Sequence, residues 1–176
     1  MIERKGVLDL LAALRNIRND RVKVYLTTNV VQGSTKYFEN VCGYIRDNHL
    51  DSRVRIAVDQ DTMHTMPRVL ANSNALVLPS HVEGLGVVLL EGMAAGIPVL
   101  GSATHGINEV IRHGENGLLF QPHDPKDMAE KIVTIASDRP LAQRLIRGGR
   151  KSVAGRFALS RQIDALERVY KDRGEG

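Results

Sequence analysis

Short, continuously apolar segments alternate along this chain with segments in which apolar residues recur at helical spacing, and this alternation limits the fold more than any other feature. Strands that alternate with helices of about 10 to 15 residues predict βαβ units, a parallel sheet and right-handed crossovers. The predicted fold class is therefore α/β, a doubly wound parallel sheet with helices on both faces. The expected strands cover residues 22–27, 54–58, 75–78, 97–100 and 118–120, and the expected helices cover residues 7–17, 35–48, 62–72, 86–96 and 107–112, before two or three terminal helices.

The loops that follow the strands are the expected ligand site. In a doubly wound sheet, ligands bind beyond the carboxyl ends of the strands, near the point where the strand order reverses. The loops after Thr27, Val58, Leu78 and Leu100 are therefore expected to border the site.

The composition is that of a soluble globular domain. The 176 residues fit a single domain, residues 1–176, with 43% hydrophobic and 25% charged residues. The longest apolar stretch, residues 87–100, is interrupted by Glu91, two glycines and a proline, so it does not predict a membrane-spanning helix. The chain begins without a charged-then-apolar leader, and Cys42 alone can form no internal disulfide, so a cytoplasmic location fits best.

The net charge of +4 is unevenly distributed, because residues 139–173 carry ten arginines and lysines against three acidic residues. Such a segment is compatible with peripheral association at the inner face of a membrane. Its basic residues are interleaved with apolar ones at helical spacing, so solvated faces of terminal helices are the simpler interpretation. No aromatic-rich RNA-binding motif accompanies them, and nucleic acid is not an expected partner.

The most informative segment follows the strand that ends at Leu78. It contains a turn with Gly84 and Gly86, and a helix is expected to begin near Gly86. The unpaired amides and positive end of a helix at the ligand edge suit an anion, phosphate above all. Glycine at these two positions lets the backbone approach a ligand closely and tolerates positive φ.

Two glutamates lie in this segment, Glu83 in the turn and Glu91 about five residues into the helix. A carboxylate amid the apolar helix surface is costly unless it is paired, and ribose hydroxyls would be suitable partners for Glu91. Each residue also has a simpler explanation. Glu83 can be a solvent-facing turn residue, and Glu91 can pair with a structural arginine or lysine.

The combined pattern is more specific than either glutamate. Pro79-Ser80-x-x-Glu83-Gly84-x-Gly86-x-x-x-x-Glu91 resembles the E-x7-E signature of retaining GT-B glycosyltransferases, and the resemblance is closest to family 4. The matching blocks cover nearly the whole chain. Besides the signature they are residues 96–100, 106–109, 114–119 and 156–157. The resemblance implies the C-terminal, Rossmann-like half of such an enzyme, which transfers a sugar with retention from a UDP-, GDP- or ADP-sugar to a glycan or glycolipid.

The resemblance also implies residue roles. Glu83 would contact the donor sugar as the catalytic-site carboxylate, and Glu91 would hold the ribose. The diphosphate would lie against the backbone of residues 84–87, with Lys5 of a Lys-Gly pair as its cation. Base contacts would come from the loop after the third strand of this half, around Val58 and Asp59. The residues assigned by resemblance to the nucleotide sugar, apart from Glu83, are Lys5, Val58, Asp59, Gly84, Leu85, Gly86, Val87 and Glu91.

This chain departs from the family pattern in several places. An arginine, the strand that precedes it and the N-terminal acceptor-binding Rossmann domain would all lie before Met1, so the isolated chain is expected to be inactive. The loop after Thr27 lacks the usual glycine-rich turn, and His105 stands where a second glycine is common. Two alternatives stay open: a GT-B epimerase or phosphorylase fragment, and a stand-alone module that binds a sugar nucleotide or a partner without catalysis.

No metal or other cofactor is expected. The sequence has no DxD-like motif at a strand end, and His81 and His105 at the ligand edge have no carboxylate or cysteine partner evident in the sequence. The remaining histidines, His123 among them, are expected to be surface residues without a role. The base, the sugar, the acceptor and the oligomeric state are not specified by these patterns.

Overall fold

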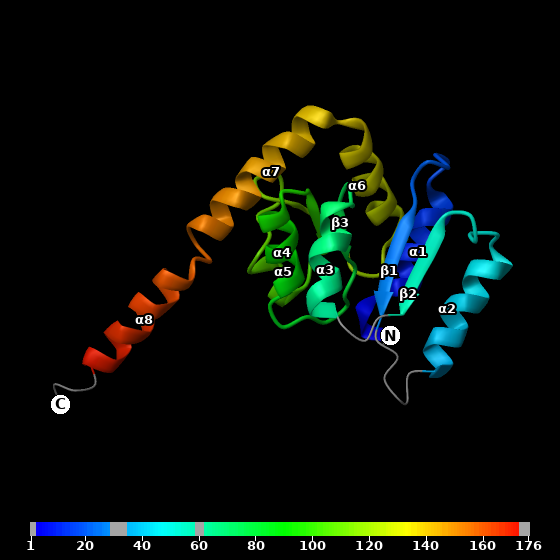
Figure 1. Cartoon of the computed structure of the whole chain (residues 1–176). Coiled ribbons are helices and arrows are strands. Elements are labelled where there is room, and N and C mark those ends of the chain that lie inside the picture. The colour runs from blue at the N-terminus through cyan, green and yellow to red at the C-terminus, as the bar shows by residue number, and fades with distance from the viewer. Residues whose placement is uncertain (1–2, 29–34, 59–61, 173–176) are drawn as a thin grey trace.

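The computed structural model describes residues 3–28, 35–58 and 62–172, in which helices alternate with parallel strands (Figure 1). The strands are β1 (Val24–Thr28), β2 (Val54–Val58), β3 (Leu76–Leu78), β4 (Val99–Ser102) and β5 (Leu118–Phe120). The helices are α1 (Val7–Asn16), α2 (Thr35–Asp47), α3 (Thr62–Ala71), α4 (Val87–Ala95), α5 (His105–Asn108), α6 (Pro125–Ser137), α7 (Arg139–Ala154) and α8 (Leu159–Asp172), and a short 3₁₀ turn, η1 (Glu3–Lys5), precedes α1. The predicted α/β fold class and the predicted order of elements are confirmed.

The strands form two hydrogen-bonded parallel sheets in the described part of the chain, β1–β2 and β3–β4–β5. β4 is central in the second sheet, and all of its residues are buried. The sequence predicted a single parallel sheet, because helical and strand spacing identify strands without showing which strands pair. The two sheets nevertheless share one apolar core, in which Leu26 and Val54 pack in the same cluster as Leu100 and Phe120.

Two apolar clusters hold the helices against the strands. Leu11 and Leu14 of α1 pack with Met128 of α6 in the larger cluster, and Leu89 of α4 packs with Ile107 of α5 in the second. Burial of a side chain of this size contributes roughly 1.5–3 kcal/mol of transfer free energy. These clusters fix α1 and α4, whose N-terminal ends border the site described below.

Helix ends follow the chemistry of the local sequence. Gly96 ends α4 in the left-handed conformation, with φ of 79°, as its lack of a Cβ predicts. The side chain of Asp124 accepts hydrogen bonds from two backbone amides at the start of α6, and Asp138 accepts one at the start of α7. These three predicted helix boundaries are confirmed.

β4 and the segment that follows it differ from the sequence prediction. The predicted strand 97–100 lies two residues later, at Val99–Ser102, and the predicted helix 107–112 is α5, His105–Asn108. The backbone amide of Arg112 instead donates to the side chain of Asn116, at 2.7 Å, in the turn that leads to β5. A side chain therefore takes a donor that a longer helix would have used, and the sequence pattern alone did not reveal this.

α7 packs against α4, and α8 extends away from the strands (Figure 1). The exposed apolar side chains of α8 include Leu159, Ile163 and Tyr170. No helix in the described residues is both long and apolar enough to cross a membrane.

Candidate functional site

The loop between β3 and α4, residues 79–86, is held closely by glycines of two other segments. A Cβ on Gly6, at the start of α1, would collide with the carbonyl oxygen of Pro79. A Cβ on Gly106, in α5, would collide with the carbonyl oxygen of Gly84. Gly6 also has a left-handed φ of 65°, which a side chain would disfavour. The β3–α4 loop is thus fixed on both sides by close backbone packing.

Lys5 and Glu83 meet at this loop. The Nζ atom of Lys5 lies 2.6 Å from Oε2 of Glu83, although the two residues are 78 positions apart in the chain. The hydroxyl of Ser80 donates to the same carboxylate oxygen at 3.1 Å, and the amide of Gly84 donates to the other oxygen at 3.3 Å. Glu83 is therefore not the free turn residue that the simpler interpretation of the sequence allowed.

The surroundings of Glu83 keep it ionised. Partial burial raises the pKa of Glu83, but the hydrogen bond and charge of Lys5, together with Ser80 and the Gly84 amide, outweigh burial and hold the pKa below its usual value. The side chain of Glu83 is 15% exposed and that of Lys5 is 37% exposed. Lys5 therefore has the more accessible side chain of the pair.

The N-terminal end of α4 lies next to this pair in the sequence. Gly86 is the N-cap residue, with a left-handed φ of 68°, and no side chain caps the helix. The first amides of an α-helix have no partner within the helix and carry the positive end of its dipole. Leu85 and Val87 are exposed on either side of Gly86. The helix therefore begins where the sequence predicted, and the anion site at its start stays a prediction.

Glu91 lies on the exposed face of α4. Leu89 and Met93 point into the core, whereas Glu91 shares its face with the exposed Val87 one turn earlier. The carboxylate is therefore exposed, although the sequence around it is apolar, because α4 has its core contacts on the other side. Glu91 forms no salt bridge with any residue that the structure describes. Its role at the ribose stays a prediction.

The predicted base-contact loop is described only in part. Val58 is the last residue of β2 and pairs with Thr28, the last residue of β1. Asp59 and residues 29–33 of the loop after Thr28 lie outside the described residues. The structure therefore places the strand ends but not the loop that was expected to contact the base.

The sequence did not predict a cluster of Asp9, His81 and His123 beside the β3–α4 loop. Nε2 of His81 lies 2.6 Å from Oδ2 of Asp9 in α1, so His81 does have a carboxylate partner. Nδ1 of His123 lies 3.8 Å from the same oxygen, and the two imidazole rings are 3.8 Å apart between centroids. The sequence offered one signal for this cluster, the positions of its residues: Asp9 lies four residues after Lys5, and His123 lies between the end of β5 and α6. Ser80, fully buried against Glu83, was also missed as a site residue.

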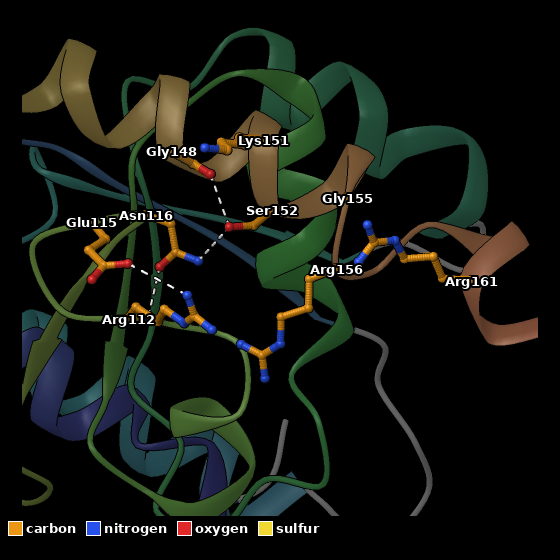
Figure 2. Close-up of a pocket in the computed structure, with 9 residues that line it drawn as sticks. All are labelled: Arg112, Glu115, Asn116, Gly148, Lys151, Ser152, Gly155, Arg156 and Arg161. Carbon is orange, nitrogen blue, oxygen red and sulfur yellow. Dashed lines mark hydrogen bonds and ion pairs between the residues drawn. The ribbon is translucent and has the colours of Figure 1, made fainter. Parts of the chain in front are cut away.

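A separate basic hollow of about 580 Å³ lies between the turn before β5, the second half of α7 and the start of α8 (Figure 2). Its lining includes the basic residues Arg112, Lys151, Arg156 and Arg161. Arg112 lies 3.8 Å from the carboxylate of Glu115, and Arg156 lies 3.7 Å from that of Glu109, so part of the basic charge is paired within the protein. Lys5, Glu83 and Glu91 do not line this hollow, so it is distinct from the site around the β3–α4 loop.

Comparison with known proteins identifies the family. The model of the family "Glycosyl transferases group 1" matches residues 1–152, which is most of the chain. The N-acetyl-alpha-D-glucosaminyl L-malate synthase of Bacillus anthracis is 31% identical over 140 residues, which cover 80% of this chain and 36% of that protein. The lipopolysaccharide core biosynthesis glycosyltransferase LpsE of Rhizobium meliloti is 33% identical over 164 residues, covering 93% of this chain and 45% of that protein. The chain thus spans less than half the length of these relatives.

Solved structures agree on the fold. HepE of Anabaena, in a complex with UDP and glucose, superposes with a TM-score of 0.89 at 22% identity over 98% of this chain and 46% of that one. The C-terminal domain of a glycosyl transferase group 1 family protein, LpcC of Francisella tularensis, superposes with a TM-score of 0.83 at 19% identity over 90% of this chain and 83% of that one. The predicted half of a GT-B fold is confirmed, and the chain belongs to the glycosyl transferases group 1 family.

Proposed function

We propose that this chain is the donor-binding domain of a retaining glycosyltransferase. It is proposed to bind a nucleoside-diphosphate sugar at the β3–α4 loop and the start of α4. The contact between Lys5 and Glu83 carries the proposal. It joins the cation assigned to the diphosphate and the carboxylate assigned to the sugar, beside a helix end without a side-chain cap.

The diphosphate is proposed to lie against the first amides of α4 and Lys5. The uncapped helix start supplies backbone donors and a partial positive charge. Glu83 and its hydrogen bonds hold the ammonium of Lys5 in place, while part of that side chain stays accessible. As the bond to the sugar breaks, these groups stabilise the negative charge that develops on the leaving diphosphate.

The two glutamates divide the remaining contacts. The ionised Glu83 accepts hydrogen bonds from hydroxyls of the donor sugar and orients its reacting carbon, while Glu91, exposed one turn after Val87, accepts from the ribose. Val58 and Asp59 are proposed to lie near the base. Because fixed cationic groups face the diphosphate, donor binding is expected without a divalent metal.

The donor and acceptor classes are suggested by the relatives. HepE of Anabaena was solved with UDP and with UDP-glucose, so UDP is the first nucleotide to test, ahead of GDP and ADP. LpsE is named for lipopolysaccharide core biosynthesis, which favours a glycan or glycolipid acceptor. We propose a cytoplasmic enzyme that associates peripherally with the inner face of the membrane.

Binding of nucleotides to the chain in EDTA tests this function. Calorimetry or ligand-observed NMR with UDP, GDP, ADP and UDP-glucose is expected to detect weak binding of at least one uracil or guanine nucleotide. Lys5→Ala is expected to weaken that binding by about tenfold or more, because a hydrogen bond to a charged group contributes about 1.5–3 kcal/mol. Lys23→Ala removes an exposed lysine outside the site and serves as the matched control. Binding that requires Mg²⁺ or Mn²⁺, or equal losses in both variants, would contradict the proposed site.

Sugar transfer is proposed to require a second Rossmann domain that holds the acceptor. Misplacement of the reacting groups by ~1 Å can cost about 10²-fold in rate, so donor binding alone does not suffice. We expect no transfer of radiolabelled sugar to lipid or glycan acceptors by the 176-residue chain, and transfer once the genomic upstream sequence is joined to it. Turnover by the chain alone would place an acceptor site within it, and sugar isomerisation without acceptor would favour an epimerase.

A further inference from the structure

We propose that Asp9, His81 and His123 form a binding site for one divalent transition-metal ion of the zinc class. One oxygen of Asp9 and one ring nitrogen of each histidine lie within 4.8 Å of one another. The three residues come from α1, the β3–α4 loop and the turn before α6, so only the fold brings them together.

The donor set suits zinc. Two imidazole nitrogens and a carboxylate oxygen are ligands that Zn²⁺ prefers, and three protein ligands leave a fourth position for water. Zinc bonds of about 2.0–2.1 Å place tetrahedral ligand atoms roughly 3.3 Å apart. The observed distances to Oδ2 of Asp9 fall on either side of this value, at 2.6 Å for His81 and 3.8 Å for His123. Coordination therefore requires side-chain rotations that bring His123 closer to Asp9 and separate the two imidazole rings, whose centroids are 3.8 Å apart.

Burial favours the same interpretation. The side chains of His81 and Asp9 are 21% and 24% exposed, whereas that of His123 is 66% exposed. Two ligands are therefore held by the fold, and the third can close over an ion that enters from solvent.

An ion here would connect parts of the proposed donor site. Asp9 lies four residues after Lys5, and His81 lies two residues before Glu83. A bound ion would hold the start of α1 against the β3–α4 loop. This inference goes beyond the proposed function, because Lys5 and the start of α4 serve the diphosphate without a metal. Nucleotide binding in EDTA tests that function, and metal titration without nucleotide tests the ion site.

The test is calorimetric titration of the tag-free chain with ZnCl₂, with Co²⁺ absorbance as a second probe. Wild type is expected to bind one equivalent and to give a tetrahedral Co²⁺ spectrum that Zn²⁺ displaces. Asp9→Asn and His81→Ala are each expected to weaken Zn²⁺ binding by at least about tenfold. Circular dichroism confirms that each variant is folded. A gain in melting temperature with Zn²⁺ should appear in wild type and be lost in both variants.

His123→Asn has a matched control in His49→Asn. Both histidines have left-handed backbones, with φ of 59° and 54°, a conformation that asparagine tolerates, but only His123 belongs to the cluster. We expect weaker Zn²⁺ binding in His123→Asn and wild-type binding in His49→Asn. The proposal is overturned if wild type shows no saturable one-to-one binding, or if Asp9→Asn, His81→Ala or His123→Asn binds Zn²⁺ as tightly as wild type.

Discussion

The ammonium group of Lys5 lies 2.6 Å from the carboxylate of Glu83 and thereby connects the start of α1 to the β3–α4 loop. The carboxylate also accepts hydrogen bonds from Ser80 and Gly84, so it stays ionised although it is partly buried. A cation and an anion held side by side can contact opposite parts of one ligand. A phosphate attracts the first, and sugar hydroxyls donate to the second. This relationship is the basis of the proposed donor site.

The different ligand contacts proposed for Glu83 and Glu91 can be measured separately. Glu91→Ala is expected to weaken binding of UDP and of UDP-sugar alike, by about 1.5–3 kcal/mol, the scale of hydrogen bonds to a charged group. Glu83→Ala is expected to weaken UDP-sugar binding more than UDP binding, because its partner is the sugar. Calorimetry of both variants with both ligands checks this, with Glu115→Ala as an exposed control. Equal effects of the two substitutions on both ligands would reject the assignment.

Gly106 is expected to be essential for the shape of the loop. In Gly106→Ala, the new Cβ collides with the carbonyl oxygen of Gly84, so the backbone beside Glu83 must shift. We expect a loss of roughly 1–3 kcal/mol in the free energy of unfolding, as in other overpacked sites, and weaker UDP-sugar binding. Gly43→Ala is the control, because a Cβ there has no neighbour within 4 Å and lies inside α2. Urea unfolding should show Gly43→Ala as stable as wild type or more stable. A Gly106→Ala variant with unchanged stability would contradict the packing described.

Asp127 is expected to make stability depend on pH. Partial burial raises its pKa, but the backbone amide of Gln121, at 2.7 Å, and the ammonium of Lys131, at 3.0 Å, outweigh burial and hold the pKa below its usual value. Because the folded pKa lies below the unfolded one, the contribution to stability is present above the unfolded pKa, about 4, and is lost as pH falls through the folded pKa. Asp127→Asn should lower the free energy of unfolding by about 1–2 kcal/mol near pH 7. Urea unfolding at several pH values should show this difference shrink below about pH 4. A difference that is constant with pH would show that the charge of Asp127 is not its cause.

The fold was largely predictable because local rules set most of it. Strand and helix spacing predicted the order of elements, and Gly96, Asp124 and Asp138 marked helix ends through backbone and capping chemistry. The pairing of strands was not predictable in the same way. Spacing identifies a strand, whereas the division into two sheets depends on contacts between distant segments.

The site was predictable in part. The turn at Gly86 and its helix followed from the sequence, but the orientation of Glu91 did not. The surface of α4 is apolar nearly all round, so helical spacing does not show which face packs. The contacts of Glu83 with Lys5 and of His81 with Asp9 join residues more than 70 positions apart, and no local pattern encodes them.

Chemical-shift mapping of UDP on the isotope-labelled chain, in EDTA, tests the central claim most directly. The largest changes are predicted in the amides of Leu85, Gly86 and Val87 and in the signals of Lys5, because the diphosphate is proposed to lie against them. The lining of the basic hollow around Arg112 and Ser152 should stay unchanged (Figure 2). Shift changes that gather in the basic hollow, or none at saturating UDP, would contradict a donor site at the start of α4.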